Sequence, residues 1–337
     1  MKSYIKSESK EWAREFLQGQ WSTLVTPFNE QGNIDEKGLR SNIEYVKSLG
    51  SNGAGCSWGM GEFWSMTTEE RKNLMQIVID QAQDWPVAAH VTHTSVNDII
   101  ELLSYTEQIG YELLIIGAPY FATRKPSQVI EFIEYICSKT DLAIMYYNSP
   151  QFGTILNESE LDQIVNIENI VGVKEASFNK EISINSHKTL GEKAVISTPD
   201  EWIFWEGEKL GFQQQVMFAN TSDWRFDTPD NNSYTQFVQD ACKGNIDNDL
   251  YVAGVTQMDY LIVIRCLSFK THLIHEIFKN IWVKTRHLIA GKQASSPRIF
   301  GFSSTTAWDR KCPIQSRNTR CRLLDKACSS KLSLRSA

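Results

Sequence analysis

The chain has 337 residues, 42% of them hydrophobic, and a formal net charge of −6 at pH 7. This apolar content is enough for a large buried core, and no apolar run reaches the roughly 18 residues that a membrane span needs. The acidic balance argues against nucleic acid as the main partner, and the polar, charged amino terminus argues against a secretory signal, so the sequence predicts a cytoplasmic protein.

Short apolar runs alternate with amphipathic segments along most of the chain. The predicted strands are Trp21–Phe28, Gly53–Trp58, Pro86–Val91, Glu112–Ile116, Leu142–Tyr147, Ile170–Lys174, Ala194–Ser197 and Gln214–Phe218. Helical spacing of apolar residues predicts helices at 35–49, 67–83, 96–109, 127–138 and 158–165. The even spacing, with no Gly-rich dinucleotide loop after the first strand, favours an α/β protein with a (β/α)8 TIM barrel over a doubly wound sheet.

The domain prediction follows from this alternation. Residues 1–20 are expected to form an N-terminal helix, 21–245 the barrel, 246–297 a C-terminal helical region and 298–337 an atypical basic tail. The tail has nine Lys and Arg against two acids and little amphipathic period. We therefore expect it to be a disordered basic segment or a divergent end.

Lys174 closes one predicted strand, and Tyr147 closes the strand before it. Burial disfavours an ammonium, so a lysine there tends to have a lowered pKa and a nucleophilic amine that can form a Schiff base with a ketone. A neighbouring tyrosine could move the protons that this chemistry needs. The alternative is a lysine whose ammonium reaches the surface. The barrel context favours catalysis, because barrel enzymes carry their chemistry at strand ends.

Six ordered segments resemble the family of dihydrodipicolinate synthase and N-acetylneuraminate lyase, which are class I aldolases of pyruvate and related 2-oxo acids. The segments are Thr23–Phe28, Gly61–Phe63, Ala118–Tyr120, Lys125–Gln128, Tyr147–Pro150 and Val171–Glu175. The resemblance spans about residues 21–245. It implies that Lys174 carries the imine, that Tyr147 is the acid and base, and that the chain forms a homo-oligomer (dimer or tetramer). The imine mechanism requires no metal and no other cofactor.

The turn after the second predicted strand departs from the family pattern. Where the family has Gly-Thr-Thr-Gly-Glu, this chain has Trp58-Gly59-Met60-Gly61-Glu62. Gly59 and Met60 still offer backbone N–H groups for a substrate carboxylate, but the hydroxyl that relays protons is lost. Trp64, just beyond the turn, is predicted to pack beneath a loop.

Aromatic residues replace polar ones at the expected pocket mouth. By the resemblance, Phe121 stands nearest to the second tyrosine of the family's synthases, and Phe152 stands where dihydrodipicolinate synthase has the arginine for a distal carboxylate. With Trp58, they predict an apolar substrate-binding wall. His90 ends the third predicted strand and His93 follows it, so either could bind substrate or exchange protons.

Three functions fit these residues. The first is a Schiff-base lyase or aldolase that joins or cleaves a 2-oxo acid and an apolar or aromatic aldehyde. The second is a 2-keto-3-deoxy sugar acid dehydratase or hydratase of the same fold, which Phe152 opposes because a sugar acid needs polar walls. The third is a non-catalytic small-molecule binder, which the retained Lys174 and Tyr147 oppose. All three predict small-molecule partners, with no nucleic acid and no membrane.

Overall fold

The computed structural model describes residues 3–218 and 227–255, and eight parallel strands form its centre. The strands are β1 (Gly19–Thr23), β2 (Gly53–Cys56), β3 (Val87–His90), β4 (Leu113–Gly117), β5 (Ala143–Asn148), β6 (Ile170–Glu175), β7 (Val195–Ser197) and β8 (Val216–Phe218). The α-helices are α1 (Ser9–Phe16), α2 (Glu36–Ser48), α3 (Thr68–Ala82), α4 (Val96–Ile109), α5 (Pro126–Cys137), α6 (Glu158–Val165), α7 (Lys180–Leu190), α8 (Trp202–Leu210) and α9 (Ser233–Cys242). Four short 3-10 helices are η1 (Lys6–Glu8), η2 (Gly59–Gly61), η3 (Phe63–Ser65) and η4 (Pro150–Phe152).

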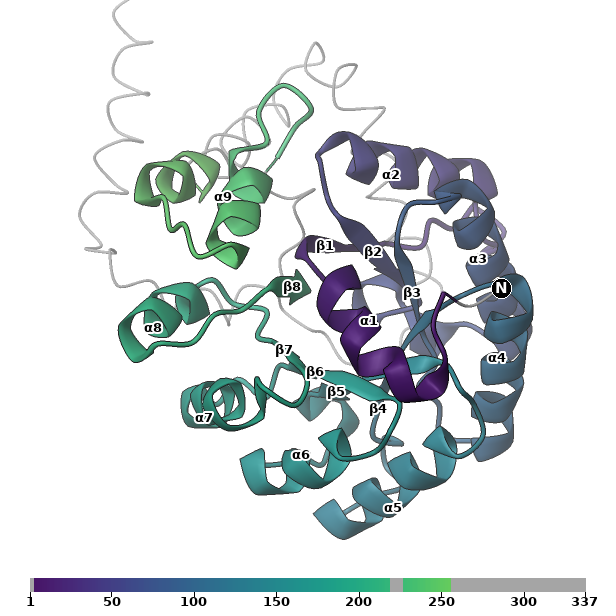
Figure 1. Ribbon diagram of the computed structural model, residues 1–337. Coiled ribbons are helices and arrows are strands. Elements are labelled where there is room, and N and C mark those ends of the chain that lie inside the picture. The colour runs from purple at the N-terminus through teal and green to yellow at the C-terminus, as the bar shows by residue number, and fades with distance from the viewer. Residues whose placement is uncertain (1–2, 219–226, 256–337) are drawn as a thin grey trace, which may run out of the picture. The chain divides into compact units, whose positions relative to one another are not determined.

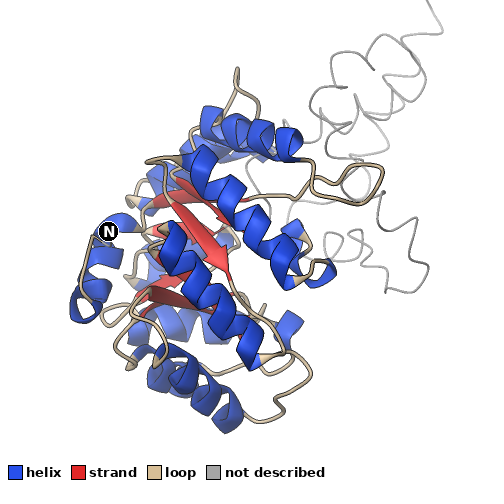
Figure 2. Ribbon diagram, turned by 90° about the vertical axis from the view of Figure 1, so that its right-hand side faces the viewer, coloured by secondary structure: helices blue, strands red, loops and turns tan. Residues whose placement is uncertain are grey.

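The strands pair in the order β7-β6-β5-β4-β3-β2-β1-β8, with helices outside them (Figure 1). Figure 2 shows the same arrangement from the side, with the strands enclosed by helices. The predicted (β/α)8 barrel is confirmed. None of the described helices is long and apolar enough to cross a membrane.

The first strand differs from its prediction. It runs over Gly19–Thr23, whereas the sequence predicted residues 21–28, so the barrel begins inside the segment expected to be an N-terminal helix. Gly19 pairs with Val216 of β8, and this long-range pairing sets the start. The strand ends early because the chain turns away: Thr26 donates a hydrogen bond to the Gly61 carbonyl at 2.7 Å, and Pro27 has no N–H for a sheet. Of the predicted region 246–297, only residues up to 255 are described, and 248–255 are helical; the 298–337 tail lies outside the described residues.

Side chains close the seam between β7 and β8, the two ends of the hydrogen-bonded order. The Ser197 hydroxyl accepts from the Phe218 N–H at 3.0 Å. Gln214 accepts from the Thr198 N–H at 2.6 Å and donates to the Thr198 carbonyl at 3.0 Å. Glutamine thereby satisfies backbone groups that a paired strand would otherwise satisfy.

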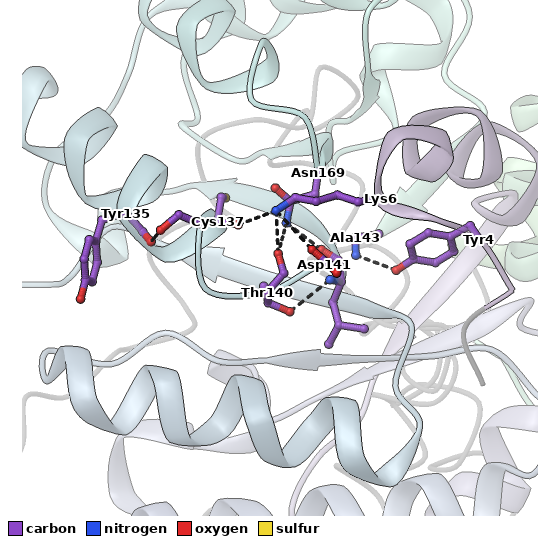
Figure 3. A network of polar contacts seen from close by, with 10 residues as sticks. Tyr4, Lys6, Tyr135, Cys137, Thr140, Asp141, Ala143 and Asn169 are labelled. Carbon is purple, nitrogen blue, oxygen red and sulfur yellow. Dashed lines mark hydrogen bonds and ion pairs between the residues drawn. The ribbon is translucent and has the colours of Figure 1, made fainter.

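The N-terminal segment covers the amino ends of the later strands. Its basic side chains Lys6, Lys10 and Arg14 recur every four residues and donate to carbonyl oxygens at or just after the C-terminal ends of α5, α6 and α7. The acceptors are Cys137 (3.0 Å) and Thr140 (2.9 Å) for Lys6, Val165 (2.6 Å) for Lys10 and Gly191 (3.2 Å) for Arg14. Figure 3 shows Lys6 among its acceptors, with Tyr4 bonded to the first residue of β5. Cations suit these positions because a helix C-terminus presents unpaired carbonyl groups and a negative dipole end.

Candidate active site

Lys174 and Tyr147 lie side by side at the carboxyl ends of β6 and β5, where the register pairs them directly. Lys174 is only 2% exposed. Its Nζ lies 4.7 Å from the centre of the Tyr147 ring and 4.1 Å from that of Trp58. Among the described residues, no hydrogen bond or ion pair of this Nζ is found, so aromatic faces are its close neighbours.

Burial separates the protonation behaviour of the two residues. It lowers the pKa of Lys174 to about 7, and the carboxylate of Asp200 acts weakly in the opposite direction. It raises the pKa of Tyr147 to about 12, against a hydrogen bond with Ser149. At neutral pH the site therefore holds a large fraction of neutral amine beside a protonated phenol, which are a nucleophile and an acid.

Sequence reasoning missed Asp200. It lies between β7 and α8, three residues after the last residue of β7, and acts electrostatically on Lys174. Its position just beyond a predicted strand end was the available signal, because the carboxyl ends of barrel strands carry the site.

Trp58 and Phe152 both lie against Tyr147. The ring centroids are 6.4 Å apart for Trp58 and Tyr147 and 5.2 Å apart for Phe152 and Tyr147. Each ring packs on a glycine: a Cβ added at Gly55 would overlap Trp58, and one at Gly117 would overlap Phe152. The structure thus brings together two of the three aromatic residues that the sequence singled out, in space left by glycines on β2 and β4.

His90 is buried beside this wall, with its ring centre 6.3 Å from that of Tyr147. Its Nε2 lies 2.7 Å from the Thr92 hydroxyl, which also accepts from the Gly117 N–H at 2.7 Å. The Ser57 carbonyl, 2.8 Å from Nδ1, can only accept, so Nδ1 carries the proton of the neutral ring and Nε2 accepts from the Thr92 hydroxyl. Burial holds the pKa of His90 well below its usual range, with the Arg71 charge acting in the same direction. Both ring nitrogens have hydrogen-bond partners, so we assign His90 a structural role, in which it supports the packing of the aromatic wall.

Arg71 of α3 is a buried cation that sequence reasoning also missed. Its guanidinium donates to the Ser57 hydroxyl and the Thr92 carbonyl, both at 2.9 Å, and to the His90 carbonyl. Burial lowers its pKa to about 10. Arg71 thereby fastens the loops after β2 and β3. No spacing rule distinguishes such an arginine from one on a solvated helix face, because its acceptors lie on other elements, 14 to 21 residues away in the sequence.

Other predicted residues lie away from the Lys174 amine. Phe121 is 91% exposed, has a left-handed φ of 67° and contacts Tyr120, so this chain does not bring it to Lys174. The side chain of His93 accepts from the Ser95 N–H at 2.9 Å in the loop before α4. The prediction for Trp64 is wrong: its side chain is 52% exposed, because η3 turns it outward beside Phe63.

Gly59 and Met60 form η2, directly after Trp58. A Cβ added at Gly59 would lie 3.1 Å from the side-chain oxygen of Gln151, which belongs to η4. The turn that carries the expected carboxylate donors therefore lies against the segment that carries Phe152.

Comparison with known proteins identifies the family of the chain. The model of the dihydrodipicolinate synthetase family matches residues 17–224. The N-acetylneuraminate lyase of Fusobacterium nucleatum is 28% identical over 190 residues, which are 56% of this chain and 66% of that protein. The 4-hydroxy-tetrahydrodipicolinate synthase of Methanothrix thermoacetophila is 30% identical over 191 residues, which are 55% of this chain and 63% of that protein. The matched region thus spans less than two thirds of the length of either relative.

Solved structures show the same fold. The chloride-inhibited dihydrodipicolinate synthase from Acinetobacter baumannii, complexed with pyruvate, has a TM-score of 0.62 at 19% identity, covering 82% of this chain and 99% of that one. N-acetylneuraminate lyase from Fusobacterium nucleatum has a TM-score of 0.58 at 22% identity, covering 89% and 94%. The chain belongs to the dihydrodipicolinate synthetase family.

Proposed function

We propose that the protein is a class I lyase or aldolase that forms a Schiff base between Lys174 and pyruvate or a related 2-oxo acid. The observation that carries this proposal is the buried Lys174 amine, whose pKa is lowered to about 7, next to the protonated Tyr147. Family membership supports the same reaction class.

The chemistry uses these two side chains in sequence. The neutral amine of Lys174 attacks C2 of the 2-oxo acid, and the former carbonyl oxygen leaves as water when the imine forms. Tyr147 donates a proton toward that oxygen and later accepts one. Loss of a C3 proton gives an enamine, whose carbon attacks the aldehyde while the aldehyde oxygen takes up a proton. Water then hydrolyses the new imine and frees Lys174.

The substrate carboxylate is assigned to the backbone N–H groups of Gly59 and Met60, since a turn can bind an anion through such groups. The aldehyde is assigned to the aromatic wall. Phe152 is buried against Tyr147 and offers no charge to a second carboxylate. Burying an unpaired carboxylate there would cost several kcal/mol, so an apolar or aromatic aldehyde fits better.

Reductive trapping tests the imine. Borohydride added with pyruvate, or with members of a panel of 2-oxo acids, should reduce the imine and leave a mass increase on the peptide that carries Lys174. Lys174→Ala should show no adduct under the same conditions. An adduct at another lysine, or no adduct with any acid of the panel, contradicts the proposal. The panel should include 2-keto-3-deoxy sugar acids, because efficient turnover of these would favour the dehydratase, and binding without an adduct would favour the non-catalytic binder.

A second panel tests the aldehyde. Because Trp58 and Phe152, the described aromatic residues of the wall, carry no charge to pair a carboxylate, aspartate semialdehyde should react with a kcat/KM at least about tenfold below that of an aryl or alkyl aldehyde. Phe152→Arg should narrow or reverse this preference by offering a bidentate partner. Equal or better kcat/KM with the semialdehyde in the unmodified protein would refute the apolar assignment.

We also propose a homo-oligomer, either a dimer or a tetramer. Family membership and the highly exposed aromatic ring of Phe121 support it. Sedimentation equilibrium of the full chain measures the assembled mass, and a monomer at assay concentrations would contradict the proposal.

A further inference from the structure

Trp58 covers the nucleophile. Its side chain is 1% exposed, and its ring centre is 4.1 Å from the Nζ of Lys174. The Tyr147 ring also lies close to the amine, at 4.7 Å, and its centre is 6.4 Å from that of Trp58. With Lys174 itself only 2% exposed, a 2-oxo acid cannot reach the amine unless a neighbouring side chain moves.

The Trp58 side chain is held by packing, with its ring centre 5.4 Å from that of Phe218. Its indole N–H is buried and has no hydrogen-bond partner among the described residues. The ring rests on Gly55, and a Cβ there would overlap it. A buried N–H without a partner costs free energy, so any movement that gives this group an oxygen acceptor is favoured by that amount.

The residues before and after Trp58 differ in how firmly their backbone conformation is held. Ser57 has a left-handed φ of 59°, which is costly for a residue with a side chain, and Arg71 and His90 hold it there by hydrogen bonds to its hydroxyl and carbonyl groups. Gly59 follows Trp58. Side-chain contacts therefore hold Ser57. Gly59 begins η2, where its carbonyl accepts from the Glu62 N–H at 3.1 Å, but it has no side chain to restrict a change of backbone conformation.

We infer that Trp58 is a gate that closes over Lys174 when its ring rests on Gly55 and that opens to admit the substrate. In the open position the indole N–H gains an oxygen acceptor, from water or from the carboxylate of the entering acid. The gate controls access to the site of the proposed function and rests on it for the identity of what enters. The size of the opening, which the Trp58 ring and Gly55 set, limits which 2-oxo acids reach the amine.

Covalent labelling of lysines measures the gate without catalysis. The full chain is treated with acetic anhydride at pH 8, and the labelling rates of Lys174 and Lys6 are compared by mass spectrometry. Lys6 is the internal standard, because it is bound at the other end of the barrel with a side chain 24% exposed. Relative to Lys6, Trp58→Ala should label Lys174 at least about tenfold faster than the unmodified protein, as expected when a shielded state becomes accessible. Gly55→Ala displaces the Trp58 ring without changing the side chain of Trp58 or Lys174, and it should also raise the labelling rate of Lys174.

Trp64→Ala is the matched control, since it removes an exposed tryptophan six residues away and should leave the Lys174 rate unchanged. Trp58→Phe covers the case in which the alanine variant does not fold: it keeps an apolar ring, removes the N–H and should give an intermediate rate. Labelling of Lys174 at the unmodified rate in folded Trp58 and Gly55 variants overturns the gate. Faster labelling without a trapped adduct from any 2-oxo acid supports the gate while refuting the proposed function.

Discussion

The lysine side chains at the two ends of the barrel have different surroundings. At the amino end, Lys6 and Lys10 each donate to backbone carbonyl oxygens near helix C-termini. At the carboxyl end, Lys174 is more deeply buried and meets aromatic faces, with a pKa lowered to about 7. Burial lowers the pKa of Lys10 as well, although its ammonium has a carbonyl acceptor. Lys174 has no acceptor among the described residues, and burial there leaves a large fraction of neutral amine. The same side chain therefore stabilises the fold at one end and is suited to act as a nucleophile at the other.

Removing the lysine at each end gives the sharpest contrast. Lys174→Ala should reduce turnover to the uncatalysed background, because it removes the nucleophile, and should preserve the melting temperature, because it also removes a poorly solvated amine. Lys6→Ala should leave kcat unchanged. Steady-state rates and thermal unfolding are measured for both variants. Residual turnover by the Lys174 variant would contradict the assignment of Lys174 as the nucleophile.

The adjacent tyrosines of β5 extend the comparison to the two faces of one strand. Tyr147→Phe should lower kcat by roughly 10²–10⁴-fold, the range for a lost general acid or base. Tyr146→Phe should leave kcat unchanged and be neutral or mildly stabilising, because the buried Tyr146 hydroxyl has no partner among the described residues. Similar losses of kcat in both variants would indicate a packing effect.

The pH dependence should follow Lys174. Imine formation needs the neutral amine, so its rate should fall as pH drops through about 7. Between about 7 and 10.5, the unfolded chain binds a proton at this lysine that the folded chain does not, so this group makes stability rise with pH across that window. The difference in unfolding free energy between the unmodified protein and Lys174→Met isolates this contribution.

The fall in rate at low pH, which we call the acid limb, should persist in His93→Ala. The ring nitrogens of His90 are already engaged, so His90→Ala should affect stability more than the position of the limb. Loss of the limb in either histidine variant would assign the proton relay to histidine, as the sequence also allowed.

The smallest effect is expected at the amino end. Lys6→Met removes two hydrogen bonds to backbone carbonyl groups and should lower the free energy of unfolding by roughly 1–3 kcal/mol. Denaturant titration measures this loss, and Lys37→Met provides a control on an exposed helix position. Loss of catalytic activity in the folded Lys6 variant would show that the two ends are coupled.

The sequence by itself determined the barrel and the ends of the strands that carry Tyr147 and Lys174. Periodicity and local capping fixed the bounds of α2 to α6 to within about one residue: Thr67 and Glu70 form a reciprocal cap at the start of α3, as Asn157 and Glu160 do at α6. Once strand and helix alternate, the carboxyl ends of the strands must share one face, which is why Lys174 and Tyr147 could be paired before any coordinates.

Tertiary structure alone decided what surrounds these two residues. The start of β1 depends on pairing with β8, which lies next to it in the sheet but far from it in the sequence. The protonated nitrogen of His90 depends on the Ser57 carbonyl. The buried Arg71 depends on two carbonyl groups at and just after the end of β3 and on the Ser57 hydroxyl in the loop after β2. The cover over Lys174 depends on one tryptophan and the glycine beneath it. Local patterns carry no information on such contacts, because each is set by how distant segments pack and which hydrogen-bond partners they leave available.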